Sequence, residues 1–411
     1  MIAILKREWK SYFQNITGWL FIAAVLALYG LYFLAYNLRA GYPYVSYTLS
    51  AISFIMLIAV PILTMRSMAE ERHSRTDQLV LTAPVSLGKM IFGKFLAMVG
   101  VFTVAVAVIA VTPLVLAAFG TVPMGENYVA VLGFWLYGCT CIAVGMLASA
   151  LTESQVIAAV VAFAFLFLGY MMNSITGLIG DHLITKVLGA YDLYTPLQSF
   201  MSGCLDLTGV VYFVSVTALC LFLTCQCVQK RRWSMTTKKL TTGMFSVAMI
   251  VVGFAVAVAV NMVVKEMPSS WTAVDATSTK LYSLTDTTKD YVKNLSQDVT
   301  IYVLSSEKSA DSTLAETLQR YEDLSKHLNV VYKDPAKSPN FYQQYTDSAP
   351  SQNSMIVVSD ARSRVVDYSD IYEYSYDYST YSSSVDGYDA EGQLTSALQY
   401  VTKADSELPV I

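Results

Sequence analysis

The chain has 411 residues, of which 55% are hydrophobic and only 14% charged, and its net charge at pH 7 is −4. Its mean hydropathy is +0.47. Soluble globular domains carry about 25% charged residues, so this composition excludes that class and indicates a membrane protein. The apolar residues are concentrated in residues 1–265, whereas residues 266–411 are rich in Ser, Thr, Asp and Tyr. The sequence therefore predicts a membrane part followed by a soluble part.

Seven apolar runs are long enough to cross a bilayer, because a spanning helix needs roughly 20 mostly apolar residues. They cover residues 17–38, 46–65, 95–119, 128–151, 155–178, 208–228 and 243–264. The expected fold class is a membrane all-α bundle of about six helices plus one further transmembrane helix, followed by a soluble α/β domain. The expected divisions are a transmembrane domain (1–228), a basic cytoplasmic linker (229–242), a seventh helix (243–265) and an extracytoplasmic domain (266–411).

The basic residues predict the orientation, since Lys and Arg accumulate in cytoplasmic loops. Three groups fall on one side if every run crosses the membrane, and the opposite loops hold only Arg39 and Lys186. We therefore expect a multi-pass protein of the cytoplasmic (plasma) membrane with its N-terminus inside and residues 266–411 outside. The three groups are Lys6, Arg7 and Lys10; Arg66, Arg72, Arg75, Lys89 and Lys94; and Lys230, Arg231, Arg232, Lys238 and Lys239.

The first 16 residues combine Trp9, Tyr12 and Phe13 with three basic residues. Such a composition is typical of a helix that lies in the inner membrane interface with its basic face on anionic lipid. It is also compatible with an elbow helix that contacts a cytosolic partner as well.

The polar segment between the second and third runs opens with a helical charge pattern. Glu71 and Arg75 are four residues apart, in the favourable order with the acid first. Leu79, Val80 and Leu81 form a short apolar patch, and Pro84 is expected to end the helix. Taken alone, this pattern indicates no more than a solvated cap on the membrane domain.

Two segments carry a recognisable pattern. The first comprises residues 68–72 (MAEER), Thr76 and 79–86 (LVLTAPVS), followed by Gly93-Lys94; the second is 148–159 (ASALTESQVIAA). Both resemble segments of ABC-2 type transporter permeases of the gliding-motility (Gld) type. The resemblance implies that the first segment couples to a separate ABC ATPase subunit and that the second is a short inner loop. Arg75 stands where that family usually has Gly. The coupling residues implied in this way are Glu70, Glu71, Arg72, Arg75, Thr76, Leu79, Leu81, Pro84 and Glu153.

The chain itself is not expected to be an enzyme. Residues 88–94 (GKMIFGK) approach a phosphate-binding loop, but Phe95 replaces the hydroxyl residue that binds Mg²⁺, so ATP hydrolysis is expected on the partner. The apolar runs lack a convincing ionisable residue, which argues against a proton-coupled carrier. The pairs Cys139/Cys141 and Cys225/Cys227 diverge on a helix and cannot each clamp one ion, so neither a metal nor a cofactor is predicted.

Residues 266–411 show the pattern of an α/β domain. We expect helices at 286–295, 314–327 and 390–401, a parallel strand pair at 298–305 and 328–333, and a hairpin at 355–359 and 364–368. This part resembles the Gld-type ABC auxiliary domain through Val274-Asp275 and residues 280–284 (KLYSL), 299–303 (VTIYV), 333–335 (KDP) and 389–398 (DAEGQLTSAL). In that family the domain continues further, so the chain is expected to be incomplete at its C-terminus, where residues 408–411 begin a strand.

An acidic, Tyr-rich stretch covers residues 367–391. Its carboxylates do not follow the spacing of a calcium-binding loop. The tyrosines could stack on sugars or peptides, and the alternative is a solvated edge strand or loop. No set of residues suited to hydrolysis converges here.

The sequence thus predicts a permease subunit of an ABC transporter that moves a substrate out of the cytoplasm. The expected partners are an ABC ATPase subunit, a second permease half in a homodimer or heterodimer, and the lipid bilayer, but no nucleic acid. The alternative is a non-transporting envelope complex, in which the ATPase moves an external domain that binds or organises a cell-surface ligand. A membrane-anchored enzyme would need a catalytic set that the sequence does not contain.

Overall fold

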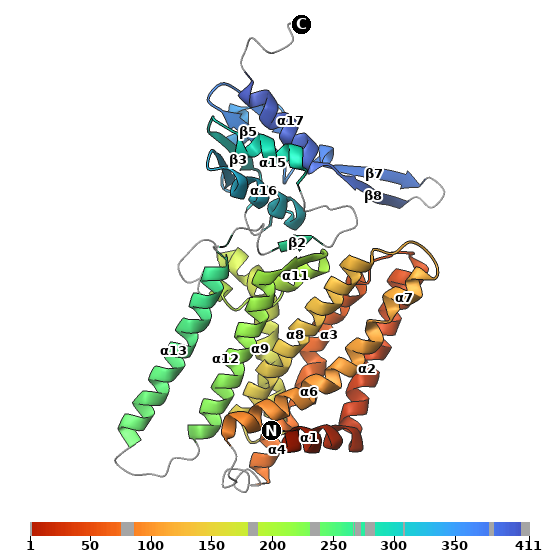
Figure 1. Ribbon diagram of the computed structural model, residues 1–411, viewed down its shortest axis with the longest axis vertical. Helices are drawn as coiled ribbons and strands as arrows, with labels where there is room; N and C mark the ends of the chain where they lie inside the picture. The colour runs from red at the N-terminus through yellow and green to blue at the C-terminus, as the bar shows by residue number, and fades with distance from the viewer. Residues whose placement is uncertain are drawn as a thin grey trace. The chain divides into compact units, whose positions relative to one another are not determined.

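The computed structural model describes residues 2–74, 86–179, 188–230, 239–265, 267, 273–275, 284–306, 309–377 and 382–403. The chain folds into two compact units (Figure 1). The first comprises Met1–Met267 and Thr272–Ala276, and the second comprises Pro268–Trp271 and Thr277–Ile411. Each unit has a hydrophobic core of its own.

The first unit is a bundle of long apolar helices that lie side by side, with the shorter α1 and α4 at one end and α11 at the other (Figure 1). Among the described residues, seven helices are long and apolar enough to cross a membrane, which confirms the predicted helical membrane bundle. The helices are α1 (Ile2–Gln14), α2 (Ile16–Phe33) with the π-helix η1 (Leu34–Arg39), α3 (Ser46–Thr64), α4 (Arg66–His73), α6 (Leu87–Ile109), α7 (Thr112–Ala117), α8 (Met124–Leu151), α9 (Gln155–Ile179), α11 (Thr195–Met201), α12 (Leu207–Lys230) and α13 (Lys239–Lys265).

The third span differs from the prediction at both ends. It was expected over residues 95–119, but α6 begins at Leu87 and therefore contains Lys89 and Lys94. The helix ends at Ile109, and α7 restarts at Thr112 with Pro113 in its first turn. Proline is accepted there because the first turn of a helix needs no intrahelical N–H donor.

The centre of the bundle is α8, where glycines allow neighbouring elements to approach closely, as small residues commonly do in membrane helices. A Cβ atom at Gly138 would overlap the Phe102 ring, and one at Gly145 would overlap Thr64. Large side chains such as Phe134 and Tyr137 on the same helix are fully buried. Among the described residues, none of the cysteines forms a disulfide.

The first unit also contains a small antiparallel sheet that the sequence did not predict. Strand β1 (Cys204–Asp206), directly before α12, pairs with β2 (Ala273–Asp275), which follows α13. In this register Cys204 lies opposite Asp275 and Leu205 opposite Val274. Residues 273–275 lie within the segment 266–411 that is expected outside the membrane, and by their contacts they belong to the first unit.

The second unit is a four-stranded sheet in the order β4-β3-β5-β6, with helices packed on one face. Strands β3 and β4 are parallel, and the other neighbours are antiparallel, which confirms the predicted parallel pair and hairpin. The Tyr-rich stretch adds a separate two-stranded sheet with a bulge, β7–β8, which projects from the body of this unit (Figure 1). The elements are α15 (Asp286–Lys293), β3 (Val299–Val303), α16 (Ser312–Leu324), β4 (Leu328–Tyr332), η2 (Phe341–Gln344), β5 (Met355–Ser359), β6 (Ser363–Val366), η3 (Tyr368–Asp370), β7 (Tyr372–Asp377), β8 (Ser382–Tyr388) and α17 (Ala390–Thr402).

Candidate functional site

The candidate site lies where α4 continues from the end of α3, and Ser149 on α8 fixes this junction. The Ser149 hydroxyl donates to the carbonyl oxygen of Met65 at 3.0 Å and accepts from the backbone N–H groups of Met68 and Ala69 at 3.1 Å each. Backbone groups at helix ends lack intrahelical partners, and their burial without a hydrogen bond is costly. Because Ser149 is fully buried, these three bonds set the direction in which α4 leaves α3.

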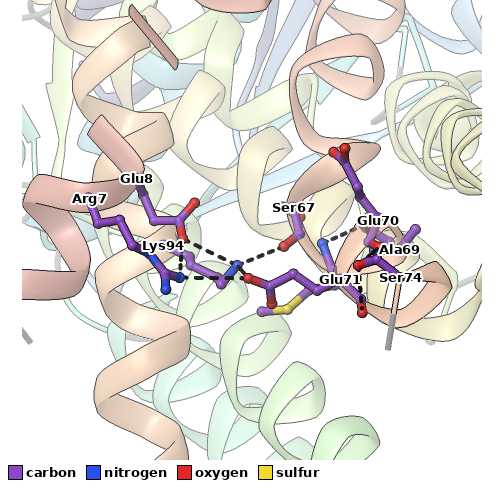
Figure 2. Close-up of polar contacts among 10 residues, drawn as sticks. Arg7, Glu8, Ser67, Ala69, Glu70, Glu71, Ser74 and Lys94 are labelled. Carbon is purple, nitrogen blue, oxygen red and sulfur yellow. Dashed lines mark hydrogen bonds and ion pairs between the residues drawn. The ribbon is translucent and has the colours of Figure 1, made fainter. Parts of the chain in front are cut away.

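A buried lysine joins α4 to two other helices (Figure 2). The side chain of Lys94 is only 3% exposed, and its Nζ atom lies 2.6 Å from Glu71 Oε1 and 3.6 Å from Glu8 Oε1. It also donates to the carbonyl oxygen of Ser67 at 3.0 Å. A buried ammonium group is tolerated only when its charge and its donors are matched in this way.

Arg7 completes the group, which we call the charge cluster: Arg7, Glu8, Glu71 and Lys94. The Arg7 guanidinium lies 2.7 Å from Glu8 Oε1 and 3.7 Å from Glu71 Oε1. Its hydrogen bond to Glu8 raises the pKa of Arg7, so the arginine stays charged. Two cations and two carboxylates thus hold α1, α4 and α6 together with no net charge.

Two more exposed ion pairs flank the cluster. Arg66 binds Glu70 through two parallel bonds, of 2.8 Å from Nε and 2.9 Å from a terminal nitrogen. Arg72 lies 2.7 Å from Glu153, in the short loop between α8 and α9, and also donates to the carbonyl oxygen of Leu151. The Arg72–Glu153 pair brings together the two segments that resemble the permease family.

Four of the predicted coupling residues are therefore assembled at one place: Glu70, Glu71, Arg72 and Glu153. The other five lie outside the described residues, and so does the proposed helical pairing of Glu71 with Arg75. The described partners of Glu71 are Lys94 and Arg7. The five residues outside the described part of the chain are Arg75, Thr76, Leu79, Leu81 and Pro84.

Helix α1 also belongs to this site, which was not predicted from the sequence. The helix crosses the end of the bundle (Figure 1) and packs on α6, where a Cβ atom at Gly100 would overlap the Trp9 ring. The signal that could have revealed the contact is Lys94, the second of two lysines in the stretch that begins at Leu87 and the one that an apolar run follows directly. Such a residue needs an acidic partner, and Glu8 is the only acidic residue among the first 16.

These contacts define a multi-pass membrane protein in which a charged helix between the second and third spans is locked to three neighbouring elements. Residues 39–228 match the family model of the ABC-2 family transporter protein. Residues 278–371 match the model of a domain of unknown function, DUF7088. Comparisons with curated proteins and with solved structures give no match. The first match supports an ABC-2 type permease, the membrane subunit of an ABC transporter, and does not favour the envelope-complex alternative.

Proposed function

We propose that this chain is the permease subunit of a Gld-type ABC transporter that moves a substrate out of the cytoplasm. A separate ABC ATPase binds α4, the segment that follows it and the α8–α9 loop. The observation that carries the proposal is the Arg72–Glu153 ion pair, which joins α4 to the α8–α9 loop inside the part of the chain that matches the transporter family.

The contacts of α4 supply a mechanism for the coupling. The charge cluster ties α4 to α1 and α6, and Ser149 ties it to α8. Closure of the ATPase subunits pushes on α4, and the linked helices respond together because packed elements move as rigid bodies. Glu70 and Glu153 face this partner, since their side chains are 45% and 62% exposed.

The basic residues beside the first, second and sixth spans support an orientation with α1 and α4 in the cytoplasm. In this orientation the second unit is an extracytoplasmic auxiliary domain of a cytoplasmic-membrane protein. A second permease half, identical or different, completes the transporter, and the external unit is available to a cell-surface ligand.

The proposal is tested by purifying the tagged full chain in mild detergent and measuring both the recovery of a P-loop ATPase and its stimulated activity. Glu70→Lys is the best single variant, because Glu70 is exposed, whereas reversal of Glu71 would also break the charge cluster. We expect Glu70→Lys to lower the recovery and the stimulated rate several-fold while membrane insertion is unchanged. The double variant Arg66→Glu/Glu70→Arg keeps an ion pair between positions 66 and 70 but still reverses the charge at position 70. It should therefore not restore the recovery of the ATPase or its stimulated rate.

Asp286→Lys is the matched control. Asp286 is an exposed carboxylate of the second unit that pairs with the nearby Lys289, as Glu70 pairs with the nearby Arg66. This substitution should leave both readouts unchanged. The proposal fails if the wild-type chain purifies without an ATPase under conditions that retain other membrane complexes. The assignment of Glu70 fails if its reversal behaves like the control.

A further inference from the structure

The small sheet β1–β2 holds the chain to the first unit between the two segments of the second unit. Strand β2 ends at Asp275, and Thr277–Ile411, the longer segment of the second unit, follows it. Helix α13 packs along α12, but none of its residues Ala248–Lys265 is buried inside the protein, which suits a helix surrounded by lipid. The last described attachment before the longer segment of the second unit is therefore β2, not α13.

The partner strand β1 rests on a tightly packed base. The Phe200 ring of α11 lies against Gly133 of α8 and Gly209 of α12, where added Cβ atoms would overlap it or press closely on it. Asp206, the last residue of β1, accepts a hydrogen bond of 2.8 Å from the Thr208 N–H and so caps the start of α12. Such close packing leaves β1 little freedom to move independently of α8, α11 and α12.

Helix α8 connects this base to the candidate coupling site. It is one uninterrupted helix of 28 residues, and an α-helix rises about 1.5 Å per residue, so it reaches roughly 40 Å. Ser149 near its C-terminal end binds the α3–α4 junction, and Gly133 nearer its N-terminal end supports Phe200. Direct contacts thus run from α4 through α8 and α11 to β1, and β1 pairs with β2.

We propose that the β1–β2 pairing is the mechanical link through which movement of the membrane bundle reaches the second unit. The inference rests on the proposed function for the source of the movement, whereas the pairing itself does not depend on it. In this role the sheet stays paired throughout the cycle of ATP binding and hydrolysis by the partner ATPase, and α13 serves as a membrane anchor.

The pairing is tested with the native Cys204. Opposite residues in an antiparallel pair have Cα atoms about 4.5–5.5 Å apart, within the range that a disulfide spans. Asp275→Cys places a second thiol opposite Cys204, and mild oxidation should cross-link them in most molecules of the full chain. A protease site inserted between residues 231 and 238 reveals the bond, because the two fragments then separate only after reduction. Val274→Cys, which lies opposite Leu205, is the control, and equal cross-linking of the two variants would overturn the pairing.

The mechanical role is tested by breaking or locking the sheet. Val274→Pro removes a backbone donor from β2 and should disrupt the pairing. A pair of fluorophores at positions 128 and 400, introduced as non-natural amino acids at two exposed tyrosines, reports on the distance between the units when nucleotide is added with the ATPase. We expect nucleotide to shift the distance between the two fluorophores in the wild type and in the cross-linked Asp275→Cys protein. In Val274→Pro the shift should be lost although ATP hydrolysis continues.

The inference is overturned if Val274→Pro retains the full shift, if the cross-link abolishes it, or if the wild type hydrolyses ATP without any shift. Because the cross-link forms without nucleotide, it decides the pairing even where no ATPase binds. A failure of the proposed function is thereby distinguished from a failure of the link.

Discussion

Lys94 Nζ and Glu71 Oε1 lie 2.6 Å apart, and this contact joins α6 to α4 inside the first unit. Glu8 of α1 also faces the lysine, so a single buried ammonium group holds three helices that meet at one end of the bundle. The site is consequently sensitive to the loss of one charge, whereas the exposed pairs around it can be exchanged at little cost.

Replacement of Lys94 by Met should destabilise the first unit by about 3 kcal/mol, because it removes the buried cation that faces the partly buried carboxylates of Glu71 and Glu8. Thermal unfolding of the full chain in detergent measures this loss. The double variant Lys94→Met/Glu71→Gln should recover part of it. Lys89→Met is the control, since Lys89 lies exposed on the same helix and should change the stability by no more than about 0.5 kcal/mol. Equal effects of the two lysine substitutions would contradict the assigned role of Lys94.

Replacement of Gly100 by Ala should displace α1 from the bundle, because the added methyl group overlaps the Trp9 ring. Overpacking of this kind costs about 1–3 kcal/mol. The expected result is faster proteolysis within residues 2–14 of the detergent-solubilised chain. Gly30→Ala on α2 adds the same group where no heavy atom lies within 4 Å and should leave proteolysis unchanged. The packing of Trp9 on α6 would be refuted if both variants were cleaved like the wild type.

Asp367 should make the second unit sensitive to acid. Burial alone would raise the pKa of Asp367, but hydrogen bonds from Ser369 and Ser351 outweigh burial, and the pKa lies below its usual value. A carboxylate with a lowered pKa in the folded state adds stability above its unfolded pKa of about 3.9, and this stability is lost as the pH falls further towards the folded pKa. We therefore expect the second unit to lose stability below about pH 4.

Asp367→Asn should flatten this acid dependence and destabilise the second unit by about 1–3 kcal/mol at neutral pH, because the amide cannot accept all five hydrogen bonds that the serines donate. Hydrogen exchange of the β5 and β6 amides in the full chain, followed against pH, measures both effects. Asp360→Asn, in the exposed turn between these strands, is the control. An unchanged acid dependence in Asp367→Asn would rule out this carboxylate as its cause.

The sequence predicts those features that depend on neighbouring residues along the chain. The length of each apolar run is enough to identify a spanning helix, and the alternation in residues 299–303 is enough to identify β3. The family resemblance assigned Glu70, Glu71, Arg72 and Glu153 to ATPase coupling but predicted no contact among them. The Arg72–Glu153 ion pair is a contact between the two segments that only the structure reveals.

The features that the sequence did not reveal depend on contacts between distant segments. Lys94 looked like an ordinary basic residue beside a membrane span, because its burial depends on Glu8, 86 positions earlier. The β1–β2 pairing joins two strands of three residues each on opposite sides of α12 and α13 in the chain. Strands of this length show no periodicity, so no local pattern could predict them.

Helix α17 determines when the second unit can complete its fold during synthesis. It contributes Leu394, Ala397, Leu398 and Val401 to the core and packs on β5 and β6, the strands made before it. Until the ribosome has added residue 401, the sheet presents an apolar face with no cover from this helix. The nascent second unit is therefore most vulnerable to aggregation and proteolysis after β6 has been made and before α17 has left the ribosome. A chaperone that binds apolar strands would act in that interval.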